Sequence, residues 1–186
     1  MNERPELLIA RGNEARRRGL PDEAMRCFAR AFAAAGDADA RNARAQSLIG
    51  MGRIERDRGR LDAALARYDE AILLLRAAHD ELAVAHAVRH TGDILRELGD
   101  APRALERCVE ALEIYRTHSN APALDVANAL RGRGLTQEIL GDAISALAAW
   151  HEARGLYDAV GVLEGVAEAD ASVRRLEPAA EPGDRT

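Results

Sequence analysis

The sequence of 186 residues contains no lysine, only two cysteines and 3% aromatic residues, and it has no long apolar run. Its 26 basic residues are therefore all arginine. We attribute the absence of lysine to codon usage in a GC-rich genome rather than to mechanism. Cys27 and Cys108 are too few for a disulfide framework or a cysteine-rich zinc site. No stretch approaches the roughly 18 apolar residues of a membrane span, and arginines interrupt the N-terminus where a signal peptide would lie. We therefore expect a soluble cytoplasmic protein with no membrane partner.

Alanine, arginine and leucine dominate the residues that are present, and alanine is the most frequent of the three. All three are strong helix formers, so the composition favours an all-helical protein. The net charge of −5 is uneven, with 13 arginines against 9 acids in residues 1–60 and 13 against 22 in the remainder. A nucleic-acid-binding domain needs a domain-wide basic balance or a dense basic patch, so we expect no nucleic-acid partner.

An internal repeat is the strongest signal in the sequence. Glycines recur seven residues apart, in the pairs Gly12 and Gly19, Gly52 and Gly59, Gly92 and Gly99, and Gly134 and Gly141. Five residues after each second glycine there is an alanine: Ala24, Ala64, Ala104 and Ala146. Four residues further on there is a larger residue: Phe28, Tyr68, Cys108 and Trp150. Another alanine follows three residues later: Ala31, Ala71, Ala111 and Ala153. This lattice, with a period of about 40 residues, predicts four copies of one structural unit.

Each position of this lattice has a physical reason. The second glycine suits a helix end, because a left-handed C′ residue is least strained as glycine. The first glycine lies two turns earlier on one helix face, where the missing side chain lets a neighbouring helix approach. The alanines and the large residue form an i, i+4, i+7 stripe on the second helix. The lattice therefore predicts repeated helical hairpins.

These hairpins resemble the tetratricopeptide repeat family. The best unit, residues 47–71, matches the family pattern at Leu48, Met51, Gly52, Ala64, Tyr68 and Ala71. The resemblance covers about residues 5–160, and the length of its period is similar to the long-period subgroup seen in kinesin light chains, mitotic-spindle adaptors and many bacterial regulators. It implies an all-α, right-handed superhelical solenoid of four helix-turn-helix units and a C-terminal capping helix.

One solenoid domain over residues 1–177 follows from this pattern. We expect units at about 5–36, 39–78, 81–118 and 122–160, and a capping helix at 162–177. Residues 178–186 have the composition of a disordered tail.

The sequence lacks a recognisable catalytic motif, so we expect no enzyme, no cofactor and no metal. The glycine-rich stretch 131–134 lies inside a helix of the fourth unit, where packing is the simpler interpretation. His86 and His90 share a helix face with Asp93 one turn on, and two imidazoles at that spacing can share a metal. No further ligand with diagnostic spacing completes such a site. Cys27, Cys108 and Trp150 fall at or beside core positions.

Function is expected in the concave groove lined by the first helix of each hairpin. The family's ligand-contact positions, carried onto this sequence, include Asn13, Arg16, Arg53, Arg56, Arg89, His90, Arg96, Asn128 and Arg131. They do not reproduce the carboxylate clamp of chaperone-binding members. A stripe of Arg53, Arg89 and Arg131 would suit carboxylates or phosphates, although such arginines are often only solvated helix charges.

The main hypothesis is therefore a non-catalytic scaffold that binds a peptide or protein segment, acidic in character, in this groove. The alternative is a self-associating structural or regulatory subunit of a larger assembly, with a homodimer formed through the solenoid ends.

Overall fold

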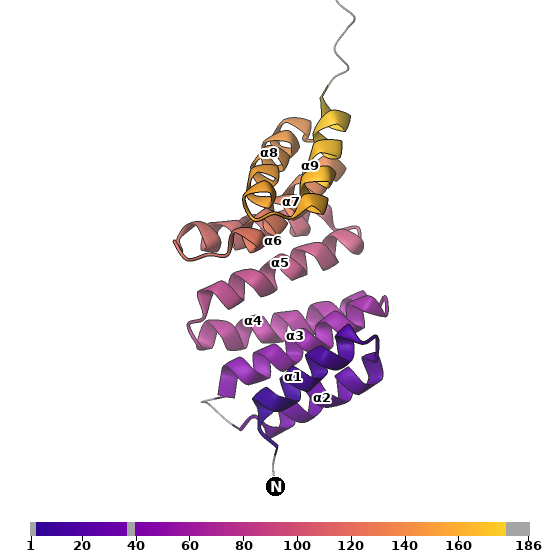
Figure 1. Cartoon of the computed structure of the whole chain (residues 1–186), viewed down its shortest axis with the longest axis vertical. Coiled ribbons are helices and arrows are strands. Elements are labelled where there is room, and N and C mark those ends of the chain that lie inside the picture. The colour runs from indigo at the N-terminus through magenta and orange to yellow at the C-terminus, as the bar shows by residue number, and fades with distance from the viewer. Residues whose placement is uncertain (1–2, 37–39, 178–186) are drawn as a thin grey trace, which may run out of the picture.

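The computed structural model describes residues 3–36 and 40–177, which form nine α-helices and no strand (Figure 1). The helices are α1 (Pro5–Arg17), α2 (Pro21–Ala34), α3 (Arg41–Asp57), α4 (Leu61–Ala77), α5 (Glu81–Glu97), α6 (Ala101–Arg116), α7 (Ala123–Ile139), α8 (Ala143–Ala159) and α9 (Leu163–Leu176). The expected tail at 178–186 lies outside the described residues. Within the described ranges, no helix combines the length and the apolarity that crossing a bilayer requires.

Consecutive helices pack as hairpins, and the hairpins stack in chain order from α1 and α2 at one end to α9 at the other (Figure 1). Among helices that are not consecutive, the closest approaches are those of α1 to α3 and of α5 to α7. The odd-numbered helices therefore form the tighter, inner wall of the stack, and the even-numbered helices form the outer wall. The all-helical repeat solenoid expected from the lattice is confirmed.

Glycines in the left-handed region end the first helix of each hairpin. At the turn between α3 and α4, Gly59 has a φ of 72° and donates its N–H to the carbonyl of Arg56 at 2.8 Å. The N–H of Arg60 then reaches the carbonyl of Glu55 at 2.9 Å, which completes the C-terminal cap. The following helix often begins with an aspartate cap, as where Asp142 accepts from the N–H of Ser145 at 3.1 Å.

Small residues and rings interlock between the helices. A Cβ added at Gly12 or at Gly50 would lie 2.7 or 2.6 Å from the ring of Phe28, so both inner helices press their backbones against that ring. Gly134 has the same relation to Trp150, which is fully buried, at 2.9 Å. The packing interpretation of the glycine-rich stretch 131–134 is therefore confirmed, and Trp150 is a core residue.

Candidate binding groove

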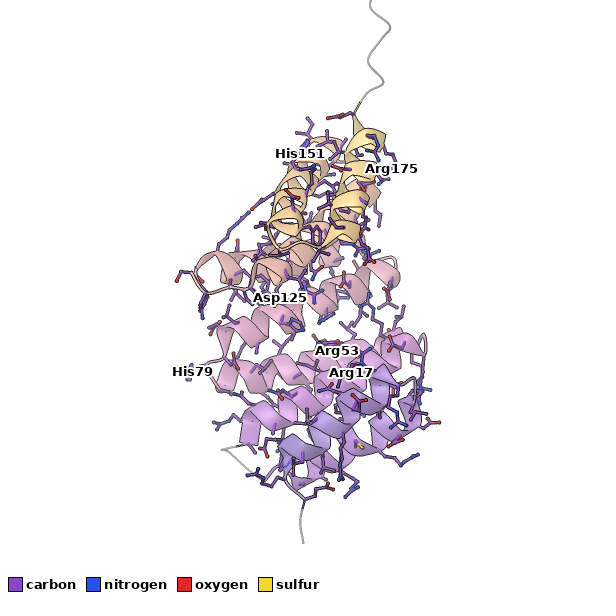
Figure 2. All side chains as sticks on the ribbon, in the orientation of Figure 1. Arg17, Arg53, His79, Asp125, His151 and Arg175 are labelled. Atoms are coloured by element: carbon purple, nitrogen blue, oxygen red, sulfur yellow. The ribbon has the colours of Figure 1, made fainter. Side chains whose placement is uncertain are left out.

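Two adjoining hollows lie on the inner wall. The first, here called the apolar hollow, has a volume of about 360 Å³. It is lined by Ile9, Asn13, Gln46, Ile49, Gly50, Arg53, Ala83 and His86. The second, here called the polar hollow, has a volume of about 380 Å³. It is lined by Arg16, Arg53, Arg56, Asp57, His86, Arg89, His90, Asp125 and Asn128. Arg53 and His86 line both hollows, so the two form one groove across α1, α3, α5 and α7. Figure 2 labels Arg53 near the middle of the stack and Asp125 closer to α9.

Arg53, His86 and Asp125 connect three inner helices through a chain of polar contacts. Arg53 Nη2 donates to His86 Nε2 at 3.0 Å, and a guanidinium has no acceptor atom, so Nε2 must be unprotonated. The imidazole proton is then on Nδ1, which lies 3.4 Å from Asp125 Oδ1. This contact from His86 lowers the pKa of the Asp125 carboxyl below its usual value. Each of α3, α5 and α7 thus supplies one member of the chain.

His90 is held in the same tautomer at the floor of the polar hollow. Arg89 Nη2 donates to His90 Nε2 at 2.8 Å, so the proton again lies on Nδ1. That Nδ1 atom is buried without a hydrogen-bond partner. Burial, and next the charge of Arg89, hold the pKa of His90 well below 6.5. The imidazole is therefore neutral at pH 7.

Carboxylates of the next inner helix neutralise several of the groove arginines. On α1, Arg16 lies 3.6 Å from Asp57 of α3. On α3, Arg56 lies 2.5 Å from Glu97 of α5. On α7, Arg131 makes a bidentate pair with Glu168 of α9, with N···O distances of 2.6 and 2.7 Å. We call these contacts the inter-repeat ion pairs, because each joins one repeat to the next.

Asp93 of α5 is buried at the centre of a cluster of charges from α3 and α5. Its side chain lies 3.3 Å from Arg89, 3.8 Å from Arg56 and 3.9 Å from Arg96. Arg89 itself is only 8% exposed. This arginine is therefore bound within the protein and is poorly placed to meet a ligand as a free charge.

Most of the groove residues expected from the sequence do come together. The two hollows contain Asn13, Arg16, Arg53, Arg56, Arg89, His90 and Asn128. Arg131 and Asn128 line a further hollow of about 290 Å³ between α7 and α9, whereas Arg96 lines none of these three. Of the expected arginines, Arg53 is the one that makes no ion pair with a carboxylate in the described part of the chain. Of the stripe Arg53, Arg89 and Arg131, the last two are paired with Asp93 and Glu168.

Sequence reasoning missed three residues of this region. Ala83 lines the apolar hollow, Asp125 receives the contact from His86, and Glu168 holds Arg131. A signal for the ion pairs was present in the sequence. Arg16 and Asp57, like Arg56 and Glu97, are separated by one repeat period plus one residue.

His86 and His90 pack against each other, and each accepts a hydrogen bond from an arginine. The His86 and His90 rings meet edge to face, with their centroids 4.8 Å apart. Both Nε2 atoms receive arginine donors, so a cation at this position would face two guanidinium groups. Within residues 3–36 and 40–177, no group of three or more histidine, cysteine or acidic side chains is placed to hold a metal ion.

Comparison with known proteins agrees with the geometry of the hairpins. The tetratricopeptide repeat family model matches residues 42–117, which cover α3 to α6 and the start of the following loop. The hairpins α3–α4 and α5–α6 therefore match the tetratricopeptide repeat model. A search of curated proteins finds no match to the sequence.

Several solved structures share the fold of this chain. BtubC (BKLC) from P. vanneervenii superposes with a TM-score of 0.74 at 20% identity, over 86% of this chain and 66% of that one. The apo form of RapI has a TM-score of 0.81 at 15% identity, over 89% and 60%. A Rap protein in complex with Competence and Sporulation Factor has a TM-score of 0.74 at 15% identity, over 91% and 47%. The chain thus spans about half to two thirds of the length of these proteins.

The neutral His90 predicts that stability falls as the pH is lowered below about 6.5. The unfolded chain takes up a proton at His90 near that pH, whereas the folded chain does not, so acidification favours unfolding by up to about 1.4 kcal/mol per pH unit. Asp125 also has a lowered pKa, but its contribution is lost only below about pH 4. Urea unfolding between pH 7.5 and 5 measures the effect. The variant His90→Gln should flatten this dependence, and an unchanged slope would contradict the assignment.

Proposed function

We propose that this chain is a non-catalytic interaction scaffold that binds a peptide or protein segment along the inner wall. The segment places an acidic group on Arg53 and an apolar side chain in the apolar hollow. The observation that carries the proposal is the position of Arg53, which is half-buried where the two hollows meet and makes no ion pair within the described residues.

Arg53 is suited to a carboxylate because its present partner is neutral. Its guanidinium donates to an imidazole, so an incoming carboxylate would replace a neutral contact with a charge-assisted and potentially bidentate one. Arg16, Arg56 and Arg131 gain less, because each would have to share or release a carboxylate that it already holds. Recognition of acid in the groove is therefore concentrated at one residue.

The apolar hollow supports the second half of the proposal. Ile9, Ile49 and Ala83 line it beside the backbone of Gly50. Its volume is near the lower end of the range of about 300 to 1,000 Å³ for ligand pockets, which suits one or two side chains of a longer segment. The expected ligand therefore carries an aliphatic side chain close to an aspartate, a glutamate or a terminal carboxylate.

The comparisons support a protein or peptide as the ligand class. One structural neighbour is a Rap protein in complex with Competence and Sporulation Factor, and tetratricopeptide hairpins present an extended concave surface. Self-association through the solenoid ends stays a prediction, which the mass of the protein at several concentrations would test.

The variant Arg53→Glu is expected to lose the partner. Reversing the charge removes the donor and repels the acid. Removing one partner of a buried, hydrogen-bonded charge pair costs about 2 to 5 kcal/mol, so capture from a native lysate should fall by more than about tenfold. The matched control is Arg26→Glu, which reverses an exposed arginine of α2 that lines neither groove hollow.

Quantitative mass spectrometry of the captured proteins measures both variants, and circular dichroism confirms that they are folded. A partner that Arg53→Glu retains as well as Arg26→Glu would contradict the proposal. Arg89 is unsuitable for this test, because its burial against Asp93 makes charge reversal a change in stability.

A further inference from the structure

The outer wall carries a separate hollow, on the face of α6 that points away from the groove. Its volume is about 570 Å³, and Pro102, Leu105 and Val109 of α6 line it together with Leu140 from the turn before α8. We propose that this outer hollow docks a basic amphipathic helix of a partner protein. This site is separate from the groove, so the scaffold could hold two partners at once.

The floor of the outer hollow is apolar and exposed. Val109 is 36% exposed and Leu140 is 43% exposed. Leu105 and Val109 are one helical turn apart, so they form a short stripe along α6. Ile144, which is 84% exposed, lies four residues after Leu140 at the start of α8. A helix with a stripe of aliphatic side chains would bury this surface.

The rim of the outer hollow has an excess of negative charge. All three arginines of α6 already hold acids: Arg103 with Asp100, Arg107 with Glu110, and Arg116 with Glu152. Glu106 and Glu113 also line the hollow, are exposed, and make no ion pair within the described residues. The charge left without compensation on α6 is therefore acidic and lies beside the apolar floor.

The spacing of these two glutamates indicates a helical partner. Glu106 and Glu113 are seven residues apart, which is two helical turns or about 10 Å along α6. A partner helix that lies along α6 would meet them with basic residues at the same spacing and would place its apolar stripe on Leu105 and Val109. Charge complementarity thus favours arginine or lysine at the flanks of that stripe.

The probe for this proposal is a synthetic, fluorescein-labelled amphipathic helix with a leucine stripe and arginines seven residues apart on one flank. Fluorescence anisotropy measures its binding to the full chain. The double variant Glu106→Gln and Glu113→Gln should weaken binding by about tenfold, which is about 1.4 kcal/mol. The matched control, Asp69→Asn with Glu70→Gln on α4, removes two exposed acids that do not line the outer hollow and should change binding less than twofold.

The variant Val109→Glu separates docking from simple charge attraction. It adds a negative charge and places that charge on the apolar floor. Docking of an apolar stripe therefore predicts weaker binding of the probe, whereas attraction by charge alone predicts tighter binding. Arg53→Glu should leave the probe's affinity unchanged, which distinguishes this site from the groove.

The proposal is overturned if the wild type does not bind the probe, if the α4 control loses as much affinity as the double variant, or if Val109→Glu binds the probe as tightly as the wild type. It is also overturned if the free chain is a dimer that Val109→Glu converts to a monomer.

Discussion

Adding one methyl group at Gly50 is expected to destabilise the protein by about 1 to 3 kcal/mol, whereas the same change at Gly155 should stabilise it by up to about 1 kcal/mol. At Gly50 the new Cβ would lie 2.6 Å from the ring of Phe28, which is fully buried and is also pressed by Gly12. At Gly155, on the exposed side of α8, nothing lies within 4 Å, so alanine contributes only its better helix propensity.

Denaturant unfolding of Gly50→Ala, Gly155→Ala and the wild type measures the two effects. Combining Gly50→Ala with Phe28→Leu should cost less than the sum of the two single changes, because the smaller side chain makes room for the methyl group. Equal stability of the two alanine variants would show that the interlocking of glycine and ring does not hold the hairpins together.

The variant Asp93→Ala is expected to destabilise the protein by about 3 to 5 kcal/mol, the cost of leaving buried charge without a partner. Asp93 is 8% exposed and is the carboxylate nearest to Arg89, at 3.3 Å, while Arg56 also holds Glu97. Without this carboxylate, Arg89 would remain buried beside a neutral His90.

Glu14→Ala is the control for this prediction, because it removes an acid from the exposed pair with Arg17, where N···O is 2.6 Å. Exposed pairs contribute about 0 to 1 kcal/mol, so the control should stay close to the wild type. Asp93→Asn should lie between the two, since it keeps a hydrogen-bond acceptor but no charge. A loss at Asp93 no larger than the loss at Glu14 would show that the buried cluster does not stabilise the fold.

The fold could be predicted because its determinants are local and repeated. Each second glycine of the lattice has a positive φ at the end of a helix, as Gly59 and Gly99 do. Where a first glycine lies against an aromatic ring, as Gly52 lies against Tyr68, the ring follows the glycine at the same distance along the sequence in each repeat. The residues of one helix face and one turn are enough to predict both the helix ends and the contacts between glycine and ring. His79 departs from the rule, because it has a φ of 56° between two hairpins, where the lattice places no glycine.

The candidate site was less predictable because its charges depend on neighbours one repeat away. The family positions placed Arg53, Arg56 and Arg131 on the inner wall, but they did not show which would be neutralised. Arg56 meets Glu97 one period plus one residue later, whereas the residue at that separation from Arg53 is the apolar Ile94. Whether a groove arginine is paired within the protein or free to bind a ligand therefore depends on the residue that the next inner helix places opposite it. A search within one repeat does not include that residue.

Photo-cross-linking of the captured partner from within the groove tests the central claim most directly. A benzophenone side chain at Gln46, which is exposed at the edge of the apolar hollow, should cross-link the partner, and sequencing of the attached peptide should find an acidic residue beside an aliphatic one. The same group at Ala66, exposed on α4, should not. Cross-linking from Ala66 but not from Gln46 would place the partner outside the inner wall and contradict the account.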